Sequence, residues 1–116
     1  MDKVFIEKLR VRCIIGVYEN ERKTPQDIFV SITLHADTRR AAKTDKAAEC
    51  VDYDALSQEI RALAESARRF TVEALAEDVV RLCLDRPGVR KVRVRVEKPD
   101  AVREAETVGV EIERKK

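Results

Sequence analysis

Metal-binding residues are scarce in this sequence of 116 residues. It has three cysteines, one histidine and no C-x-x-C pair. A structural zinc site usually takes four Cys or His ligands at short spacing. Cys13, Cys50 and Cys83 are far apart, and Cys13 and Cys83 fall on apolar periodicities that predict buried positions. We therefore expect no zinc site.

The single histidine limits nucleophilic catalysis in the same way. His35 is the only imidazole available to a Ser-His-Asp triad or a Cys-His pair. It lies inside the alternating segment 31–35, where a strand is expected. We interpret it as a solvated or barrel-facing strand residue.

Glycine and proline are also rare, at three each, which predicts few and short loops. No linker or repeat interrupts the chain, and its length is that of one domain, so we expect a single domain over residues 1–116. No apolar run approaches the 18 residues of a membrane span. The first residues alternate like a strand and lack the apolar core of a signal peptide. These absences predict a cytoplasmic protein without a membrane partner.

Charged residues, in contrast, are abundant. They make up 40% of the chain, with 24 Lys and Arg against 22 Asp and Glu, for a net charge of +2. Both signs are interspersed along the whole sequence. A nucleic-acid-binding protein usually concentrates basic residues on one face. The balance therefore argues against a nucleic-acid partner.

Four segments alternate between apolar and polar residues and predict strands. The first runs from Val4 to Ile15, and the others cover residues 28–34, 92–96 and 108–112. Within the first, the apolar residues Val4 and Ile6 occupy even positions, whereas Leu9 and the alternating apolar residues after it occupy odd positions. A bulge or face switch near residues 7–8 is expected.

Two amphipathic helices are predicted between the second and third strands. Apolar residues of the first are spaced at i, i+4, i+7 and i+11 from Leu56 to Ala67, with Asp52 or Asp54 as N-cap. The second starts after Thr71 as N-cap and stops before Pro87. We expect loops over residues 19–26 and an irregular segment over 37–50. The order ββααββ predicts an α+β domain, with an antiparallel sheet and both helices on one face.

The second face of this sheet is expected to be wet, because its residues are charged or polar: Arg10, Arg12, Thr33, His35, Arg93, Arg95, Glu111 and Glu113. A four-stranded sheet also leaves two exposed edges, which favour pairing with another subunit or closure into a barrel. The pattern suggests a ring-like oligomer with a polar lumen. A monomer with a solvated sheet is the alternative.

Four short segments carry candidate functional side chains: Glu21 in the loop after the first strand, Tyr53 at the start of the first helix, Glu73 in the first turn of the second helix and Lys98 at the end of the third strand. Each has an ordinary structural explanation. Glu73, for example, suits a helix N-terminus through the helix dipole. It lies two residues after Thr71, so it cannot complete a capping box.

Together these segments resemble the dihydroneopterin aldolase family. The resemblance rests on IGVYENER (15–22), PQ (25–26), VDY (51–53), TVEALAE (71–77), KP (98–99) and VGVEI (108–112), in collinear order. It covers nearly all of residues 3–114. It implies the tunnelling fold, ββααββ, whose sheets join into barrels as tetrameric rings, typically stacked into an octamer.

The resemblance also implies an activity in folate biosynthesis. A carbon–carbon lyase of this family cleaves 7,8-dihydroneopterin by a retro-aldol reaction, giving 6-hydroxymethyl-7,8-dihydropterin and glycolaldehyde. The imine of the dihydropterin accepts the electrons of the breaking bond. Neither a metal, a Schiff-base lysine nor another cofactor is therefore implied.

Five residues take roles by this resemblance. Glu73 corresponds to the carboxylate that binds the pterin, and the Val72 backbone adds a contact. Lys98 corresponds to the general acid/base, with Glu21 holding it and a water in place. Tyr53 corresponds to a tyrosine supplied by a neighbouring subunit.

Two alternatives stay open. A dihydroneopterin or dihydroneopterin triphosphate 2′-epimerase, an isomerase, uses nearly the same residues, and secondary epimerase activity is expected. From another class, a basic RNA-binding module would use Arg93 and Arg95 as phosphate contacts, although no stacking aromatics flank them. The segment 101–106 is more charged than the family pattern and suits either phosphate recognition or a solvated loop.

Overall fold

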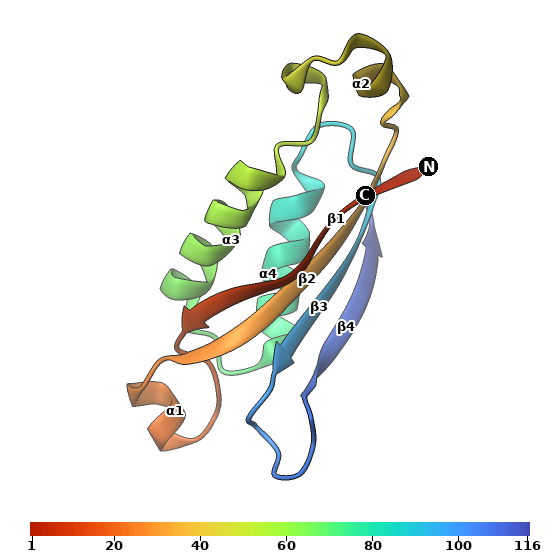
Figure 1. Cartoon of the computed structure of the whole chain (residues 1–116). Helices are drawn as coiled ribbons and strands as arrows, with labels where there is room; N and C mark the ends of the chain where they lie inside the picture. Colours follow the sequence, from red (N-terminus) through yellow and green to blue (C-terminus); the bar gives the residue numbers. More distant parts are fainter.

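Four antiparallel strands form one sheet in the order β1-β2-β3-β4 in the computed structural model, which describes residues 1–116. The strands are β1 (Asp2–Cys13), β2 (Gln26–Ala36), β3 (Lys91–Lys98) and β4 (Val108–Lys115). Helices α3 (Tyr53–Ala67) and α4 (Val72–Leu84) lie side by side on one face of the sheet (Figure 1). The ββααββ, α+β prediction is confirmed.

A bulge interrupts β1 where the parity of the sequence changes. Ile6 pairs with Ile32 and Leu9 with Val30, so β1 contains one residue more than β2 over this stretch. The extra residue places Lys8 at φ 53°, and its N–H donates to Ser31 Oγ at 2.9 Å. Of the two predicted alternatives, the bulge is confirmed, and it leaves Val4, Ile6 and Leu9 packed against the same core.

Both long helices begin at capping side chains that the sequence indicates. Asp52 Oδ1 accepts from the N–H of Ala55 at 2.9 Å, which decides between the two candidate caps of α3. Thr71 Oγ1 accepts from the N–H of Ala74 at 3.1 Å at the start of α4.

The polar segments around residues 19–26 and 37–50 are more regular than predicted. They contain the short helices α1 (Glu19–Lys23) and α2 (Arg39–Thr44) and the single 3₁₀ turn η1 (Ala47–Glu49), none of which buries a residue. Hydrophobic periodicity cannot reveal a helix without an apolar face. Local polar contacts stabilise them instead, including a carboxylate of Asp2 that accepts from the N–H and hydroxyl of Thr38.

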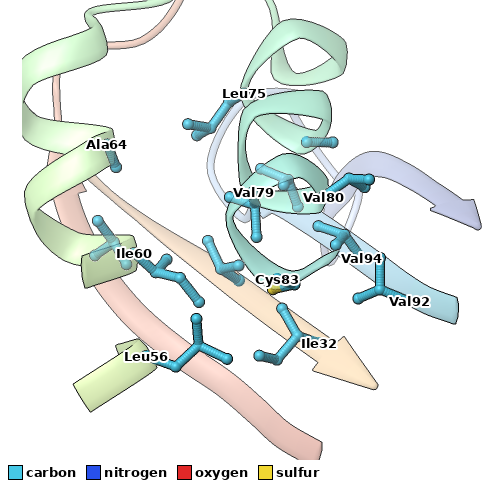
Figure 2. Close-up of a cluster of buried hydrophobic side chains, with 14 of the residues drawn as sticks. Ile32, Leu56, Ile60, Ala64, Leu75, Val79, Val80, Cys83, Val92 and Val94 are labelled. Carbon is cyan, nitrogen blue, oxygen red and sulfur yellow. The ribbon is translucent and has the colours of Figure 1, made fainter. Parts of the chain in front are cut away.

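The core lies between the helices and the inner face of the sheet. Leu56 and Ile60 of α3 and Val79 of α4 point toward Ile32 and Val94 of the strands (Figure 2), and all are buried.

Cys13 and Cys83 are part of this core, as predicted, whereas Cys50 is exposed. Burial raises the pKa of the Cys13 thiol to about 11 and that of Cys83 to about 12.

The outer face of the sheet carries the predicted polar side chains, and the arginines and glutamates predicted to face solvent there are exposed. Arg93 lies 3.5 Å from Glu113, and Arg95 lies 3.5 Å from Glu111. These carboxylates neutralise the arginines that a phosphate-binding surface would need. No helix of the chain is both long and apolar enough to cross a membrane.

Truncating a core side chain tests the helix-on-sheet packing. Ile60→Ala removes a fully buried side chain and should lower the free energy of unfolding by about 2–5 kcal/mol, because a cavity remains. Arg61→Ala, at the exposed next position, should change it by less than about 0.5 kcal/mol. Urea unfolding at one protein concentration measures both. Equal effects would show that α3 does not pack as described.

Candidate active site

The candidate residues gather at one end of the domain. At this end β1 and β3 finish, β2 and α4 begin, and α1 lies beside the last turn of α3 (Figure 1). Glu21, Glu73 and Lys98 therefore come from three separate segments that meet there. The opposite end carries α2, the start of α3 and both chain termini.

An ion pair between Lys98 and Glu21 lies at the centre of this end. Lys98 Nζ is 2.6 Å from Glu21 Oε2, and the two side chains are only 13% and 15% exposed. The residues are 77 positions apart in the sequence. Such a partly buried pair requires further hydrogen bonds to offset the loss of hydration.

Two neighbouring groups provide those hydrogen bonds. Gln26 Nε2 donates to Glu21 Oε2 at 3.2 Å and to the carbonyl of Ile15 at 2.8 Å. The N–H of Tyr18 donates to Glu21 Oε1 at 3.3 Å, which also fixes the start of α1. Both carboxylate oxygens of Glu21 are thus engaged.

These contacts determine the charge state of Glu21. Desolvation by burial raises its pKa, but hydrogen bonds from Lys98, Gln26 and the Tyr18 N–H, together with the Lys98 charge, outweigh that effect. The net result is a Glu21 pKa below the usual 4.5. The carboxylate is therefore ionised at neutral pH.

Gly16 gives the Glu21 carboxylate its space. A Cβ added to Gly16 would lie 2.2 Å from the Glu21 carboxyl carbon, and the backbone there has φ 132°. Only glycine combines this conformation with so close an approach. Sequence reasoning selected neither Gly16 nor Gln26 as a site residue, although both stand in the segments that carry the resemblance.

Glu73 lies in the first turn of α4, with its side chain exposed. The first N–H groups of an α-helix have no acceptor within the helix, so the Val72 N–H is available to a ligand. A carboxylate and a backbone donor thus stand side by side. This pair can recognise a planar group that carries both donors and acceptors.

Tyr53 is the one candidate that the chain does not bring to the others. It starts α3 at the opposite end of the domain, and its side chain is 59% exposed. The 15 residues of α3 span about 22 Å. A single chain therefore separates Tyr53 from the Lys98–Glu21 pair by roughly the length of this helix.

A cavity of about 740 Å³ lies on the outer face of the sheet, away from the helices. Its lining includes Phe5, Phe29, Arg95 and Glu97. Glu97 is only 4% exposed, although its position in the strand pattern predicts a solvated side chain. Neither Lys98 nor Glu21 lines this cavity.

The fold and this end of the sheet define a class of protein, namely an α+β domain that presents a lysine–carboxylate pair near a helix N-terminus. The family model for dihydroneopterin aldolase (FolB) matches residues 4–113. The chain belongs to the dihydroneopterin aldolase family, and dihydroneopterin aldolase is a lyase.

Individual relatives are similar to this chain in sequence and structure along nearly its whole length. Dihydroneopterin aldolase of Escherichia coli is 42% identical over 114 residues, covering 98% of this chain and 93% of that protein. The structure of the E. coli enzyme in complex with neopterin has a TM-score of 0.94, covering 98% and 99% of the two chains. A FolB structure from Vibrio cholerae has a TM-score of 0.96 at 41% identity, covering 100% and 98%.

Two further relatives show how the domain occurs elsewhere. The folic acid synthesis protein FOL1 of Dictyostelium discoideum is 38% identical over 114 residues, yet this chain spans only 17% of its length. A dihydroneopterin triphosphate 2′-epimerase of Pseudomonas aeruginosa is more distant, at 27% identity over 110 residues, covering 95% of this chain and 89% of that one.

The ionised Glu21 predicts how stability depends on pH. The pKa of Glu21 is lower in the folded state than in the unfolded state, where it is near 4.5. The ionised carboxylate should therefore contribute its full stabilisation of the fold above pH 4.5. That contribution should disappear as the pH falls through the pKa of the folded state. The difference in free energy of unfolding between wild type and Glu21→Gln, measured by urea unfolding across this range, should shrink accordingly.

Glu19→Gln provides the control for that comparison. Glu19 is exposed and pairs only with Lys23 on the surface, so its replacement should have little effect at any pH. A Glu21 difference that stays constant from neutral to acidic pH would contradict the lowered pKa.

Proposed function

We propose that this protein cleaves 7,8-dihydroneopterin into 6-hydroxymethyl-7,8-dihydropterin and glycolaldehyde, as a step in tetrahydrofolate biosynthesis. The observation that carries the proposal is the Lys98–Glu21 pair at the end of β3, in a chain 42% identical to the E. coli aldolase. The E. coli structure holds neopterin, so a pterin is the substrate class that its similarity supports.

The reaction breaks one carbon–carbon bond. A base removes the proton of the 2′-hydroxyl, the C1′–C2′ bond breaks, and C2′ with its oxygen and C3′ leaves as glycolaldehyde. The bonding electrons move into the C6–N5 imine of the dihydropterin, giving an enol-like intermediate. Protonation at C1′ then yields the hydroxymethyl product. Because the substrate contains its own electron sink, the proposed reaction requires neither a metal nor a Schiff base.

Lys98 suits the proton-transfer role. Its amine is at the open end of the sheet, and Glu21 holds it at 2.6 Å in one orientation. We assign Lys98 as the general acid/base, acting through a water, and Glu21 as the group that orients both.

Glu73 suits pterin recognition. The 2-amino group and adjacent ring N–H of a pterin form a guanidine-like edge, which a carboxylate accepts in bidentate fashion. The Val72 N–H at the start of α4 adds a donor for the neighbouring ring acceptor.

Tyr53 fits this site only across a subunit interface. Strands β1 and β4 are the edges of the sheet and leave backbone groups available for pairing with a second copy. Closure of these edges into a tetrameric ring, stacked as an octamer, would bring Tyr53 of one copy toward Lys98 of the next. The active sites would then lie between subunits.

A second activity follows from the same intermediate. If glycolaldehyde adds back before it leaves, C2′ changes configuration and the product is the epimer. The Pseudomonas epimerase belongs to the same set of relatives, which favours this side reaction over an unrelated one.

Product analysis tests the proposal directly. Purified protein incubated with 7,8-dihydroneopterin should release glycolaldehyde and 6-hydroxymethyl-7,8-dihydropterin in equal amounts. Formation of the C2′ epimer without glycolaldehyde would assign the protein as an epimerase instead.

Replacing Lys98 should affect turnover rather than binding. Lys98→Ala should lower kcat by about 10²–10⁴-fold, the usual contribution of general acid–base catalysis, and leave the Kd for neopterin nearly unchanged. Lys98→Arg should not restore activity, because a guanidinium does not release its proton near neutrality. A wild-type kcat in Lys98→Ala would show that Lys98 is not the general acid/base. Lys91→Ala, on the same strand, is the control and should leave kcat unchanged.

Mixed oligomers test the shared site. Tyr53→Phe and Lys98→Ala proteins should each be impaired, and rings refolded from both should regain activity at interfaces that pair an intact Tyr53 with an intact Lys98. Turnover of the mixture, with mixing verified by mass, measures this recovery. Activity no higher than that of the two parents would place the whole site in one chain.

A further inference from the structure

Arg22 follows Glu21 in α1 and binds three backbone carbonyls. Its Nη1 donates to the carbonyls of Gly16 and Arg69 at 3.2 and 3.1 Å, and its Nη2 donates to the carbonyl of Arg68 at 2.7 Å. One guanidinium therefore connects the loop before α1 with the segment that joins α3 to α4.

Aromatic packing strengthens the same connection. The guanidinium carbon of Arg22 lies 3.9 Å from the centroid of the Phe70 ring, within the range of a cation–π contact. The N–H of Gly16 also donates to the carbonyl of Arg69 at 3.3 Å. We refer to Arg22, Gly16 and residues 68–70 as the Arg22 clamp.

Two of the three carbonyls in the clamp, those of Arg68 and Arg69, lie just beyond the last helical residue of α3. α3 ends at Ala67, and Arg68 has the left-handed φ of 48° typical of a helix end. The last carbonyls of a helix lack intrahelical donors and carry the negative end of its dipole. The planar guanidinium of an arginine donates to several carbonyls at once, which a lysine ammonium does not.

α1 depends on contacts of this kind. It has five residues and buries none of them, and a helix this short is not stable by itself in water. Its position is set by the hydrogen bonds of Glu21 on one side and by the Arg22 clamp on the other.

The other half of the clamp has a second attachment. Arg69 forms a bidentate ion pair with Asp78 of α4, with distances of 2.7 and 2.8 Å, and the Asp78 side chain is only 6% exposed. The segment before α4 would therefore stay in place without the Arg22 side chain, whereas α1 would lose one of its two attachments.

We propose that Arg22 is a positioning residue, which holds α1 against the segment before α4 and so fixes Glu21 and its partner Lys98 relative to Glu73. Arg22 acts through Glu21 and touches no reacting atom. The inference rests on the proposed function for the roles of Lys98 and Glu73, and it adds a residue that those roles require to be correctly placed.

The expected effect is selective. Misplacement of a catalytic group by about 1 Å can cost 10²-fold in rate, so Arg22→Gln should lower kcat by about 10- to 100-fold. Neopterin should bind with nearly the wild-type Kd, because Glu73 remains at the start of α4. Amide hydrogen exchange should rise in residues 16–24 and stay unchanged in residues 72–84.

The experiment compares four proteins: wild type, Arg22→Gln, Arg22→Lys and Lys23→Gln. Lys23 is the exposed neighbour on α1 and pairs only with Glu19, so Lys23→Gln should match the wild type. Arg22→Lys keeps the positive charge but lacks the planar guanidinium. Its kcat and its amide hydrogen exchange should remain closer to those of Arg22→Gln than to those of the wild type.

Two results would overturn the proposal: wild-type kcat in Arg22→Gln, or a loss of kcat without faster exchange in residues 16–24. A wild-type kcat and wild-type amide exchange in Arg22→Lys would likewise contradict the role of the planar guanidinium. A wild type that releases no glycolaldehyde would refute the proposed function, while the exchange data alone would still show whether Arg22 anchors α1. If Arg22→Gln does not fold, Phe70→Leu removes the ring beneath the guanidinium and should give the same pattern to a smaller degree.

Discussion

The Lys98–Glu21 ion pair is the contact on which the rest of the functional end depends. It joins the end of β3 to α1 across 77 residues of sequence and is largely shielded from water. A pair in this position is stable only when other groups satisfy the carboxylate. Gln26 and the Tyr18 N–H do so, Gly16 provides the space, and the Arg22 side chain hydrogen-bonds the short helix that carries Glu21 to the segment before α4.

The residues of the proposed site are divided between the two ends of the domain. The Lys98–Glu21 pair and Glu73 lie at one end of the domain, and Tyr53 lies at the other, separated by the length of α3. The edges of the sheet are unpaired, and the cavity on its outer face does not include the ion pair. If the edges pair as proposed, a neighbouring copy would supply the tyrosine, and assembly and catalysis would then depend on the same contacts.

The sequence predicts the strands, the long helices and their caps well, because period-2 and period-3.6 patterns report which face is buried. It does not predict α1 or α2, since neither buries a residue. Lys98 and Glu21 could be selected only through the family resemblance, because no periodicity relates residues so far apart. Gly16, Gln26 and Arg22 act through close approach and backbone contacts, which only coordinates reveal.

A crystal structure of the protein with neopterin bound tests the central claim most directly. The account predicts the pterin edge on Glu73 and the Val72 N–H, the side-chain hydroxyls beside Lys98, and Tyr53 contributed by a neighbouring chain. Neopterin bound instead in the cavity on the outer face of the sheet, or in contact with Tyr53 and Lys98 of the same chain, would contradict it.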